Sequence, residues 1–541
     1  MRRRKPDLVE LDAVDLEAII ERTKTSALDT RDHEKLRATF ETFLWMMVEL
    51  EKTNTTLARL RKVLSINTKK TEKTSDVLKG RGDTEQDGEK SSEKPKAKKQ
   101  RGHGRNGADA YEGAEKIGLS HSSLKSGDPC PKCEKGKVYV LRDPRKLVRV
   151  RGQAPLPATV YELESLRCHL CGEVFCAEAP EGIGEKKYDE TSASMIGLLK
   201  YGSGLPFNRL ERLEANFKIP LPASTQWGLV KDSSRNLTAP YEELIRQAAH
   251  GDIVYNDDTS MKILTLLKEN QRIEETDSKE RTGIFTSAIV ATRGDHKIAI
   301  FLTGRQHAGE NLEDVLQRRA SELEAPIQMC DGSSRNEPKD STTILANCMA
   351  HGRRKFVEVV GSFPQECRHV LESLRQVYQN DAKTRKKKMS PEQRLDFHQT
   401  HSTEIMEALE RWMKQQLEQK KVEPNSSLGG AFSYMLKRWD KLTLFLRNPG
   451  APLDNNICER ALKKVILHRK NALFYKTENG ARVGDIFMTL IYTAELSRIN
   501  PFDYLTQLLK HADQVRNSPH EWMPWNYRTA LAVAEPVTDR P

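Results

Sequence analysis

Three acidic residues of the chain stand where side chains commonly hold metal ions. Asp257 and Asp331 each follow a short apolar run, at 253–256 and 327–330, and Glu459 lies in a predicted helix. Carboxylates at strand ends point into the crevice at the edge of an α/β sheet, where ligands bind. Three of them converging there would suit two Mg²⁺ or Mn²⁺ ions about 4 Å apart, as in two-metal phosphoryl chemistry.

Each acid alone is a weak signal, because the chain holds 77 Asp and Glu residues and most such residues are solvated. Glu459 also has a structural interpretation. Asn456 and Glu459 have the spacing of a capping box, in which the Glu closes the first turn of a helix. The residues alone therefore leave a catalytic and a structural role open.

Two Cys-x-x-Cys pairs, Cys130 with Cys133 and Cys168 with Cys171, indicate a structural metal site. Two such turns can supply four thiolates to one tetrahedral Zn²⁺, which leaves no open position for catalysis. Short runs rich in β-branched residues predict the strands of a zinc ribbon, at 137–141, 147–150 and 159–163. Coincidental spacing is the alternative. The odd total of nine Cys, without a signal-peptide pattern, indicates a reducing compartment.

The apolar pattern around the acids predicts an α/β layer with a mixed sheet that would position them. Strands are expected at 253–256, 283–292, 297–303, 326–330 and 344–349. A helix is expected at 307–322, and the polar segment 268–281 is predicted to be a loop.

The chain after the predicted sheet is expected to be helical. From residue 351 to about 448 it is heavily charged, with helices beginning at Pro364 and Pro391. Further helices are expected at 455–470 and 481–509.

A seven-residue repeat near the N-terminus predicts a leucine-zipper coiled coil. Its d positions are Leu36, Phe43, Leu50, Leu57 and Leu64, and Asn54 at an a position would favour a parallel dimer. One amphipathic helix packed on its own chain is the alternative. The next segment, 67–105, has 12 Lys and Arg against 7 Asp and Glu and almost no apolar residues, which predicts a basic disordered linker.

Three short helices are expected after the Cys pairs, at 191–201, 207–217 and 224–237. The break Lys218-Ile219-Pro220-Leu221-Pro222 separates the last two, as in a helix-turn-helix. An ordinary helical connector is the alternative.

The composition of the chain narrows the class of protein. Its 541 residues are enough for three or four domains. No apolar run approaches the roughly 18 residues of a membrane helix, and acids soon follow the basic start, unlike in a signal peptide. Lys and Arg number 88, so the net charge is +11, which favours a polyanionic partner such as nucleic acid.

Several segments, in order, resemble bacterial insertion-sequence transposases of the IS-sixty-six type. The resemblance covers about residues 36–510 and includes the end of the heptad repeat, the four-Cys module and the motifs around the acids. Its longest motifs are Lys200–Pro206, Asn256–Thr259, Cys348–Phe356, Leu453–Ala461, Arg469–Phe474 and Asn500–Leu505. The chain departs from the family pattern after Asp331, where Gly332–Asn336 replaces the usual aromatic-Ser-Gly-Tyr run.

The resemblance implies an RNase H-like catalytic domain in which Asp257, Asp331 and Glu459 form an Asp-Asp-Glu set that binds Mg²⁺ or Mn²⁺. It implies a DNA transposase that binds the terminal inverted repeats of an insertion sequence, cleaves the 3′ ends and joins them to target DNA. The residues expected to contact nucleic acid are Arg353, Arg354, Lys355, Asn455, Asn456, Arg460, Arg469 and Lys470. A solvated basic face is the alternative for the basic residues, and Asn455, Asn456 and Arg460 could instead orient Glu459.

The expected partners are double-stranded DNA, further copies in a homodimer or higher oligomer, and small accessory proteins of the element. The expected place is the bacterial cytoplasm, near the nucleoid and not in a membrane. Two other functions stay open: an RNase H-like nuclease or resolvase that cuts without joining, and a zinc-containing dimeric DNA-binding regulator that needs no Mg²⁺.

The expected domain organisation has six parts. They are an N-terminal helix and coiled coil at 1–66, a basic linker at 67–108, a zinc-binding domain at 109–180, a helix-turn-helix-like segment at 181–250, a catalytic domain at 251–475 with a helical insertion at about 357–450, and a C-terminal helical segment at 476–541.

Overall fold

The computed structural model describes residues 153–167, 174–180, 186–275 and 281–534, with shorter stretches between 19 and 39 and between 109 and 141. The chain divides into two compact units, Met1–Asp83 and Thr84–Pro541. In the first unit, residues 32–39 are helical. The remainder of the predicted coiled coil and the whole of the predicted linker segment 67–105 lie outside the described residues.

Five strands of the second unit form a mixed sheet, as the sequence predicts, in the order β5-β4-β3-β6-β7. β3 (Ile253–Ser260), β4 (Phe285–Arg293) and β5 (His296–Gly304) pair in antiparallel orientation. β6 (Ile327–Cys330) and β7 (Ile344–Asn347) continue the sheet in parallel orientation beside β3. The central strands are apolar on both faces, which is the pattern of a sheet with helices on both sides.

Helices cover both faces of this sheet. Side chains alternate along β3. On one face Thr259 contacts Arg469 of α16 (Asn456–Ala472), and on the other Asp258 contacts His307 at the start of α9 (Ala308–Leu316). Successive side chains at the end of β3 (the β3 tip, Asp257–Ser260) therefore point alternately to the face covered by α16 and to the face covered by α9.

The outer edge of β5 is covered by α17 (Glu478–Leu496). The amide of Ala299 donates to Thr493 Oγ1 at 3.1 Å, and the amide of Phe301 donates to Thr489 Oγ1 at 3.1 Å. The amide of Thr303 donates to Asp485 at 2.8 Å. Every second residue of β5 thus bonds to every fourth residue of α17. The polar face of the helix satisfies backbone amides of an edge strand that could otherwise pair with another strand.

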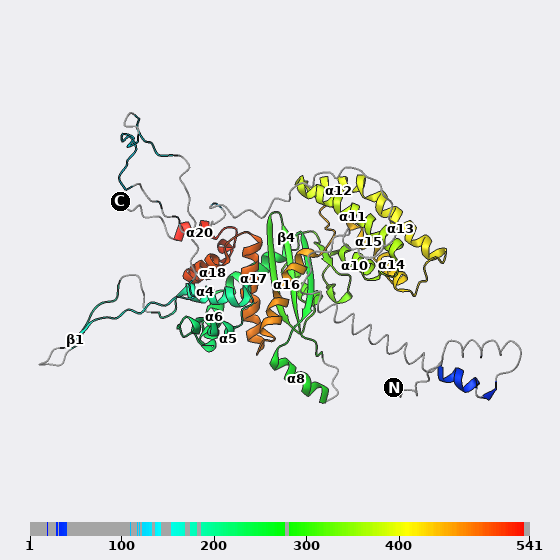
Figure 1. Cartoon of the computed structure of the whole chain (residues 1–541), viewed down its shortest axis with the longest axis horizontal. Helices are drawn as coiled ribbons and strands as arrows, with labels where there is room; N and C mark the ends of the chain where they lie inside the picture. The colour runs from blue at the N-terminus through cyan, green and yellow to red at the C-terminus, as the bar shows by residue number, and fades with distance from the viewer. Residues whose placement is uncertain are drawn as a thin grey trace. The chain divides into compact units, whose positions relative to one another are not determined.

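Helices inserted after β7 gather on one side of the sheet (Figure 1). Pro364 and Pro391 begin helices as predicted, because proline suits the first turn. The inserted helices are α10 (Met349–Val359), α11 (Pro364–Lys386), α12 (Pro391–His401), α13 (Thr403–Glu418), α14 (Ser427–Leu436) and α15 (Trp439–Leu442). Among the described residues, no helix has the length and apolar character needed to cross a membrane.

The helices before the sheet match the three expected ones and add a fourth. They are α4 (Glu190–Gly197) with a π-helical turn at Leu198–Gly202, α5 (Phe207–Asn216), α6 (Ala223–Asn236) and α7 (Thr238–Ala249). The turn between α5 and α6 is closed by Gln226, whose amide donates to the carbonyls of Phe207 and Leu221.

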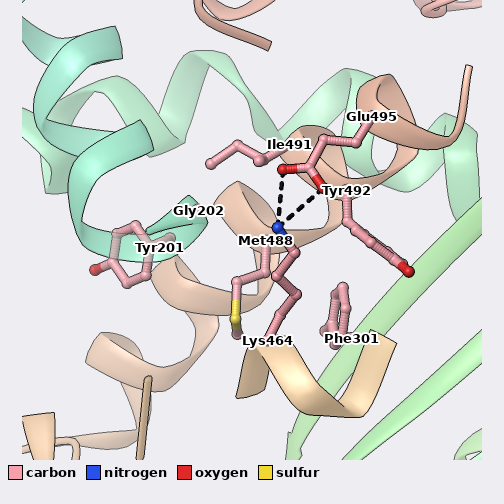
Figure 2. A pocket seen from close by; sticks show the side chains of 8 residues that line it. All are labelled: Tyr201, Gly202, Phe301, Lys464, Met488, Ile491, Tyr492 and Glu495. Atoms are coloured by element: carbon pink, nitrogen blue, oxygen red, sulfur yellow. Dashed lines mark hydrogen bonds and ion pairs between the residues drawn. The ribbon is translucent and has the colours of Figure 1, made fainter. Parts of the chain in front are cut away.

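The π-helical turn packs against α16 and α17 in a small pocket that contains Tyr201 and Gly202 (Figure 2). Lys464 of α16 and Glu495 of α17 form an ion pair at 3.0 Å across it. The helices before the sheet contact it both through α17 and directly through α7, whose Tyr241 hydroxyl donates to the Phe301 carbonyl of β5 at 3.4 Å. The C-terminal part continues with α18 (Pro501–Lys510), α19 (Ala512–Asn517) and α20 (Tyr527–Ala534).

Two local predictions are wrong. The polar segment predicted as a loop at 268–281 begins inside a helix, α8 (Leu264–Glu275). That helix forms because Leu266 is buried and the Asn270 amide donates to the Thr282 carbonyl, contacts that its polar composition conceals.

The strands predicted at 137–141 and 159–163 are not strands. The described hairpin of that region instead pairs β1 (Ser165–Arg167) with β2 (Val174–Cys176). The apolar residues of the predicted runs, such as Val140 and Val160, are exposed, so they lack the cross-strand packing that makes β-branched residues favour strands.

Candidate active site

Asp257 lies in the middle of β3 and not at its end, as the sequence had suggested. The antiparallel ladder with β4 continues to Ser260, and it pairs Asp257 with Ala288. On the other side of β3, however, the parallel ladder with β6 covers only Ile253–Tyr255. Asp257 therefore stands just past the point where the sheet opens between β3 and β6.

Asp331 directly follows β6 and comes next to Asp257. The β3–β6 register pairs Tyr255 with Met329, so continuing it by two residues sets Asp257 opposite Asp331. Asp331 Oδ1 accepts hydrogen bonds from the Ser333 backbone amide at 2.8 Å and from Asn336 Nδ2 at 2.7 Å. The segment that departs from the family pattern thus orients the carboxylate.

The inserted helix α14 holds the backbone of the Asp331 loop. Tyr434 donates its hydroxyl to the Asp331 carbonyl at 2.9 Å, and Arg438, just beyond the end of the helix, donates to the Gly332 carbonyl at 3.3 Å. Gly332 has φ of +80°, and a Cβ there would lie 2.8 Å from Arg438 Nε. Glycine suits this turn because side-chain-bearing residues rarely adopt so positive a φ.

Glu459 lies in the first turn of α16, which packs on β3 and β4. The preceding residue, Cys458, donates its thiol to the carbonyl of Ala288, the β4 partner of Asp257. The capping-box alternative is not observed: α16 begins at Asn456, its N-cap is Asn455, and no side chain caps it. Glu459 Oε1 is instead buried without a hydrogen-bond partner among the described residues.

The charges of these acids act on one another. Burial, together with the charges of Asp331, Asp258 and Glu459, raises the pKa of Asp257 to about 7. The backbone amide of Asp258, 2.8 Å from Asp257 Oδ1, acts in the opposite direction. A carboxyl that is expensive to ionise among other carboxylates is in an environment that a bound cation would relieve.

A second group next to Glu459 has ligand chemistry. Cys348, His351 and Glu459 each offer one ligand atom, and these atoms lie within 4.8 Å of one another. His351 Nδ1, like Glu459 Oε1, is buried and has no hydrogen-bond partner among the described residues. Burial and the charge of Arg354 lower the pKa of His351, while Glu459 and Asp331 act against them. His351 Nδ1 and Glu459 Oε1 fit a divalent cation, because unpaired buried acceptors are what a metal ion satisfies.

Asp258 forms a cluster that the sequence interpretation did not include. Its carboxylate lies 3.0 Å from His307 Nδ1 and 3.4 Å from Arg335, and the amide of Ala308 also points at it. The cluster ties the β3 tip to α9 and to the loop after Asp331. No sequence signal links these residues, because their separation along the chain hides the contact.

Basic residues lie on the surface near the acids. Arg354 and Lys355 are exposed on α10, with Arg354 3.9 Å from Glu459 Oε2, while Arg353 is half-buried. Arg460 and Lys470 are on α16, where Arg460 is exposed and Lys470 is exposed in the last turn.

Three other residues expected at the DNA differ in exposure. Asn455 is fully buried, and its side-chain amide donates to the Asn256 carbonyl at 3.1 Å. Asn455 is therefore packed between α16 and β3. Asn456 is exposed. Arg469 is half-buried and bonds to Thr259 and Ser260, which fixes the β3 tip.

Of the four Cys residues predicted to bind Zn²⁺, only Cys130 is described, and Cys133, Cys168 and Cys171 lie outside the described residues. The Cys130 amide donates to the Gly136 carbonyl at 2.7 Å, so the chain reverses direction directly after this Cys. A turn of this kind is compatible with a Cys-x-x-Cys metal ligand pair.

Three relatives, all from Sinorhizobium fredii and all described as uncharacterized, share part of the sequence. The protein y4jD is 27% identical over 359 residues, which are 62% of this chain and 65% of the relative. The protein y4qI is 26% identical over 350 residues, 63% of this chain and 62% of the relative. The protein y4hP is 30% identical over 202 residues, 35% of this chain and 36% of the relative. The chain thus spans less than two thirds of the length of each.

The sequence profile of the Transposase IS66 family matches residues 187–483, which is more than half of the chain. The matched segment runs from the helices before the sheet to the start of α17 and includes Asp257, Asp331 and Glu459. The chain therefore belongs to the IS66 family of transposases.

Proposed function

We propose that this chain is a DNA transposase that binds the terminal inverted repeats of an insertion sequence, cleaves their 3′ ends and joins them to target DNA. Membership of a transposase family implies a DNA-modifying enzyme with a role in transposition. The observation that carries the finer proposal is the convergence of Asp257, Asp331 and Glu459, with the pKa of Asp257 raised by burial and by the charges of the other two.

The sheet supports an RNase H-like catalytic domain. Three antiparallel strands followed by two strands parallel to the first place Asp257 and Asp331 on neighbouring strands. A helix then brings Glu459 to the same place from more than 100 residues later in the chain. These three carboxylates offer oxygen ligands, which Mg²⁺ and Mn²⁺ prefer.

In this proposal Asp257, Asp331 and Glu459 would hold the divalent cations of the site. Bound there, the cations would lower the pKa of an attacking water or 3′-hydroxyl and stabilise the leaving 3′ oxygen. Asp331 is kept in orientation by the Ser333 amide and Asn336. Asn455 orients the start of α16, and hence Glu459, through its bond to the Asn256 carbonyl.

The exposed basic residues of α10 and α16 would bind the DNA backbone. Arg354, Lys355, Arg460 and Lys470 are exposed and would make phosphate contacts, which position DNA without reading its sequence. The coiled coil would pair two copies, and the zinc module and helix-turn-helix-like segment would bind the element ends.

The decisive experiment compares Asp257→Asn, Asp331→Asn and Glu459→Gln in cleavage and end-binding assays. Each should lose several kcal/mol of transition-state stabilisation, about a hundredfold or more in cleavage rate, and keep end binding. Asp258→Asn is the matched control, since its carboxylate faces His307 on the other side of β3, and it should matter less.

Near-normal Mg²⁺-dependent cutting by any of the three variants would remove that residue from the proposal. A strand-transfer assay with pre-cut ends separates a transposase from a nuclease of the same fold, because only the transposase joins those ends to a target.

A further inference from the structure

His351 and Glu459 face each other across a short gap that no hydrogen bond fills. His351 Nδ1 lies 3.8 Å from Glu459 Oε1, beyond the reach of a hydrogen bond. Both atoms are buried and have no hydrogen-bond partner among the described residues. A buried polar atom without a partner destabilises the fold, so two such atoms facing each other indicate that something else belongs between them.

The distance between His351 Nδ1 and Glu459 Oε1 is wide enough for one metal ion to bind both atoms. Nitrogen and oxygen ligands bind first-row divalent ions at about 2.0–2.2 Å, so one ion can join two such atoms up to about 4 Å apart. The other oxygen of Glu459, Oε2, faces Arg354 at 3.9 Å, which leaves Oε1 to the side of His351.

The backbone fixes His351 in this place. α10 starts directly after β7, and the Cys348 amide donates to the Cys330 carbonyl at 2.8 Å, next to Asp331. The Met349 amide donates to the Leu453 carbonyl at 3.0 Å, a few residues before α16. The first turn of α10 is therefore clamped between the residue that precedes Asp331 and the segment that leads to Glu459.

Cys348, although close, is not available as a ligand. The Cys348 side chain is completely buried, and its sulfur already accepts a hydrogen bond from the backbone amide of Asn455 at 3.2 Å. The two atoms that face each other across the gap are thus one imidazole nitrogen and one carboxylate oxygen.

We propose that His351 is a ligand of the cation on the Glu459 side of the site. This inference rests on the two-cation site proposed above and adds a nitrogen to its oxygen ligands. Imidazole suits transition ions more than Mg²⁺ or Ca²⁺, so the site prefers Mn²⁺ over Mg²⁺ on this side. His351 then touches the reacting metal and is a catalytic residue.

The test is pulsed electron paramagnetic resonance on the full chain loaded with Mn²⁺. A directly bound imidazole gives a ¹⁴N coupling to Mn²⁺. The coupling should be present in the parent protein and absent in His351→Gln, which should still bind Mn²⁺ through the carboxylates, about tenfold more weakly or less. His307→Gln is the matched control: this His lies against Asp258 on the other face of β3, and its loss should leave the coupling unchanged.

A second variant keeps the proposal testable if His351→Gln folds poorly. His351→Asp offers an oxygen in place of the nitrogen and should bind Mn²⁺ without the ¹⁴N coupling, while the ratio of Mg²⁺ to Mn²⁺ cleavage activity rises. Mn²⁺ bound to the parent without the coupling, or a coupling that persists in His351→Gln, would overturn the inference. Either result would leave the roles of Asp257, Asp331 and Glu459 intact, since those are decided by the cleavage assay.

Discussion

Replacing Asp257 with Asn should stabilise the metal-free protein at alkaline pH while it abolishes cleavage. An ordinary Asp carboxyl titrates near 3.8, and burial together with the charges of Asp331, Asp258 and Glu459 raises the pKa of Asp257 to about 7. The folded state therefore binds more protons than the unfolded state between these two values. Because of this difference, the free energy of unfolding falls as pH rises from about 4 to about 7, and stays lower above pH 7.

The size of the effect follows from the same two values. At about 1.4 kcal/mol for each pH unit between them, the ionised carboxylate costs up to about 4 kcal/mol of stability above pH 7. The side chain introduced by Asp257→Asn would carry no charge, and its oxygen would still accept the Asp258 amide, which lies 2.8 Å from Asp257 Oδ1. This variant should therefore melt several degrees above the parent at pH 8 and at about the same temperature at pH 4.

The assay is thermal unfolding in EDTA at pH 4, 5, 6, 7 and 8, followed by circular dichroism. Mg²⁺ at pH 8 should raise the melting temperature of the parent and have little effect on the variant, because the cation removes the repulsion among the acids. Asp258→Asn is the control: it removes only one of the charges that raise the pKa of Asp257 and also loses contacts with His307 and Arg335, so its gain should be smaller. If parent and Asp257→Asn lose stability in parallel between pH 4 and pH 8, the acids do not repel one another as argued.

Three further outcomes are expected. Burial raises the pKa of Asp485 to about 8, so its ionisation lowers stability as pH rises from about 4 to 8; Asp485→Asn should melt above the parent at pH 9 but not at pH 4. Metal analysis should find about one Zn²⁺ per chain, lost in Cys130→Ser and kept in Cys176→Ser. Replacing both Leu50 and Leu57 with Pro should reduce complexes that hold two DNA ends, measured by light scattering, more than it reduces single-end binding.

Several strands of the sheet could be predicted from the sequence because they are short, apolar and separated by polar residues. The runs predicted at 283–292 and 297–303 are β4 and β5 within a few residues. The predicted end of the first strand was wrong, since β3 continues past Asp257 to Ser260. The residues Asp257–Ser260 are polar, and their pairing with β4 leaves no apolar pattern to recognise.

The surroundings of the site could not be predicted, because they depend on contacts between distant segments. Tyr434 and Arg438 bond to the Asp331 loop from about 100 residues away, and nothing in their local sequence indicates that contact. Likewise, the sequence predicts that Asn455 either contacts DNA or orients Glu459. Its burial against Asn256, which the sequence does not reveal, favours the role of orienting Glu459. Residue type suggests the chemistry of a side chain, but tertiary packing decides whether it meets solvent.

The cover that α17 provides for β5 has a consequence for how the protein is made. The backbone amides of Ala299, Phe301 and Thr303 donate to α17 side chains that lie 194, 188 and 182 residues later in the chain. During synthesis these amides have no such acceptor until α17 has been made. At a synthesis rate of about 5–20 residues per second, the nascent sheet presents an open edge for roughly 10–40 s before α17 leaves the ribosome. An apolar strand with an open edge is a template for aggregation, so products of premature termination before residue 496 should be insoluble, and chaperones should bind the nascent chain during that interval.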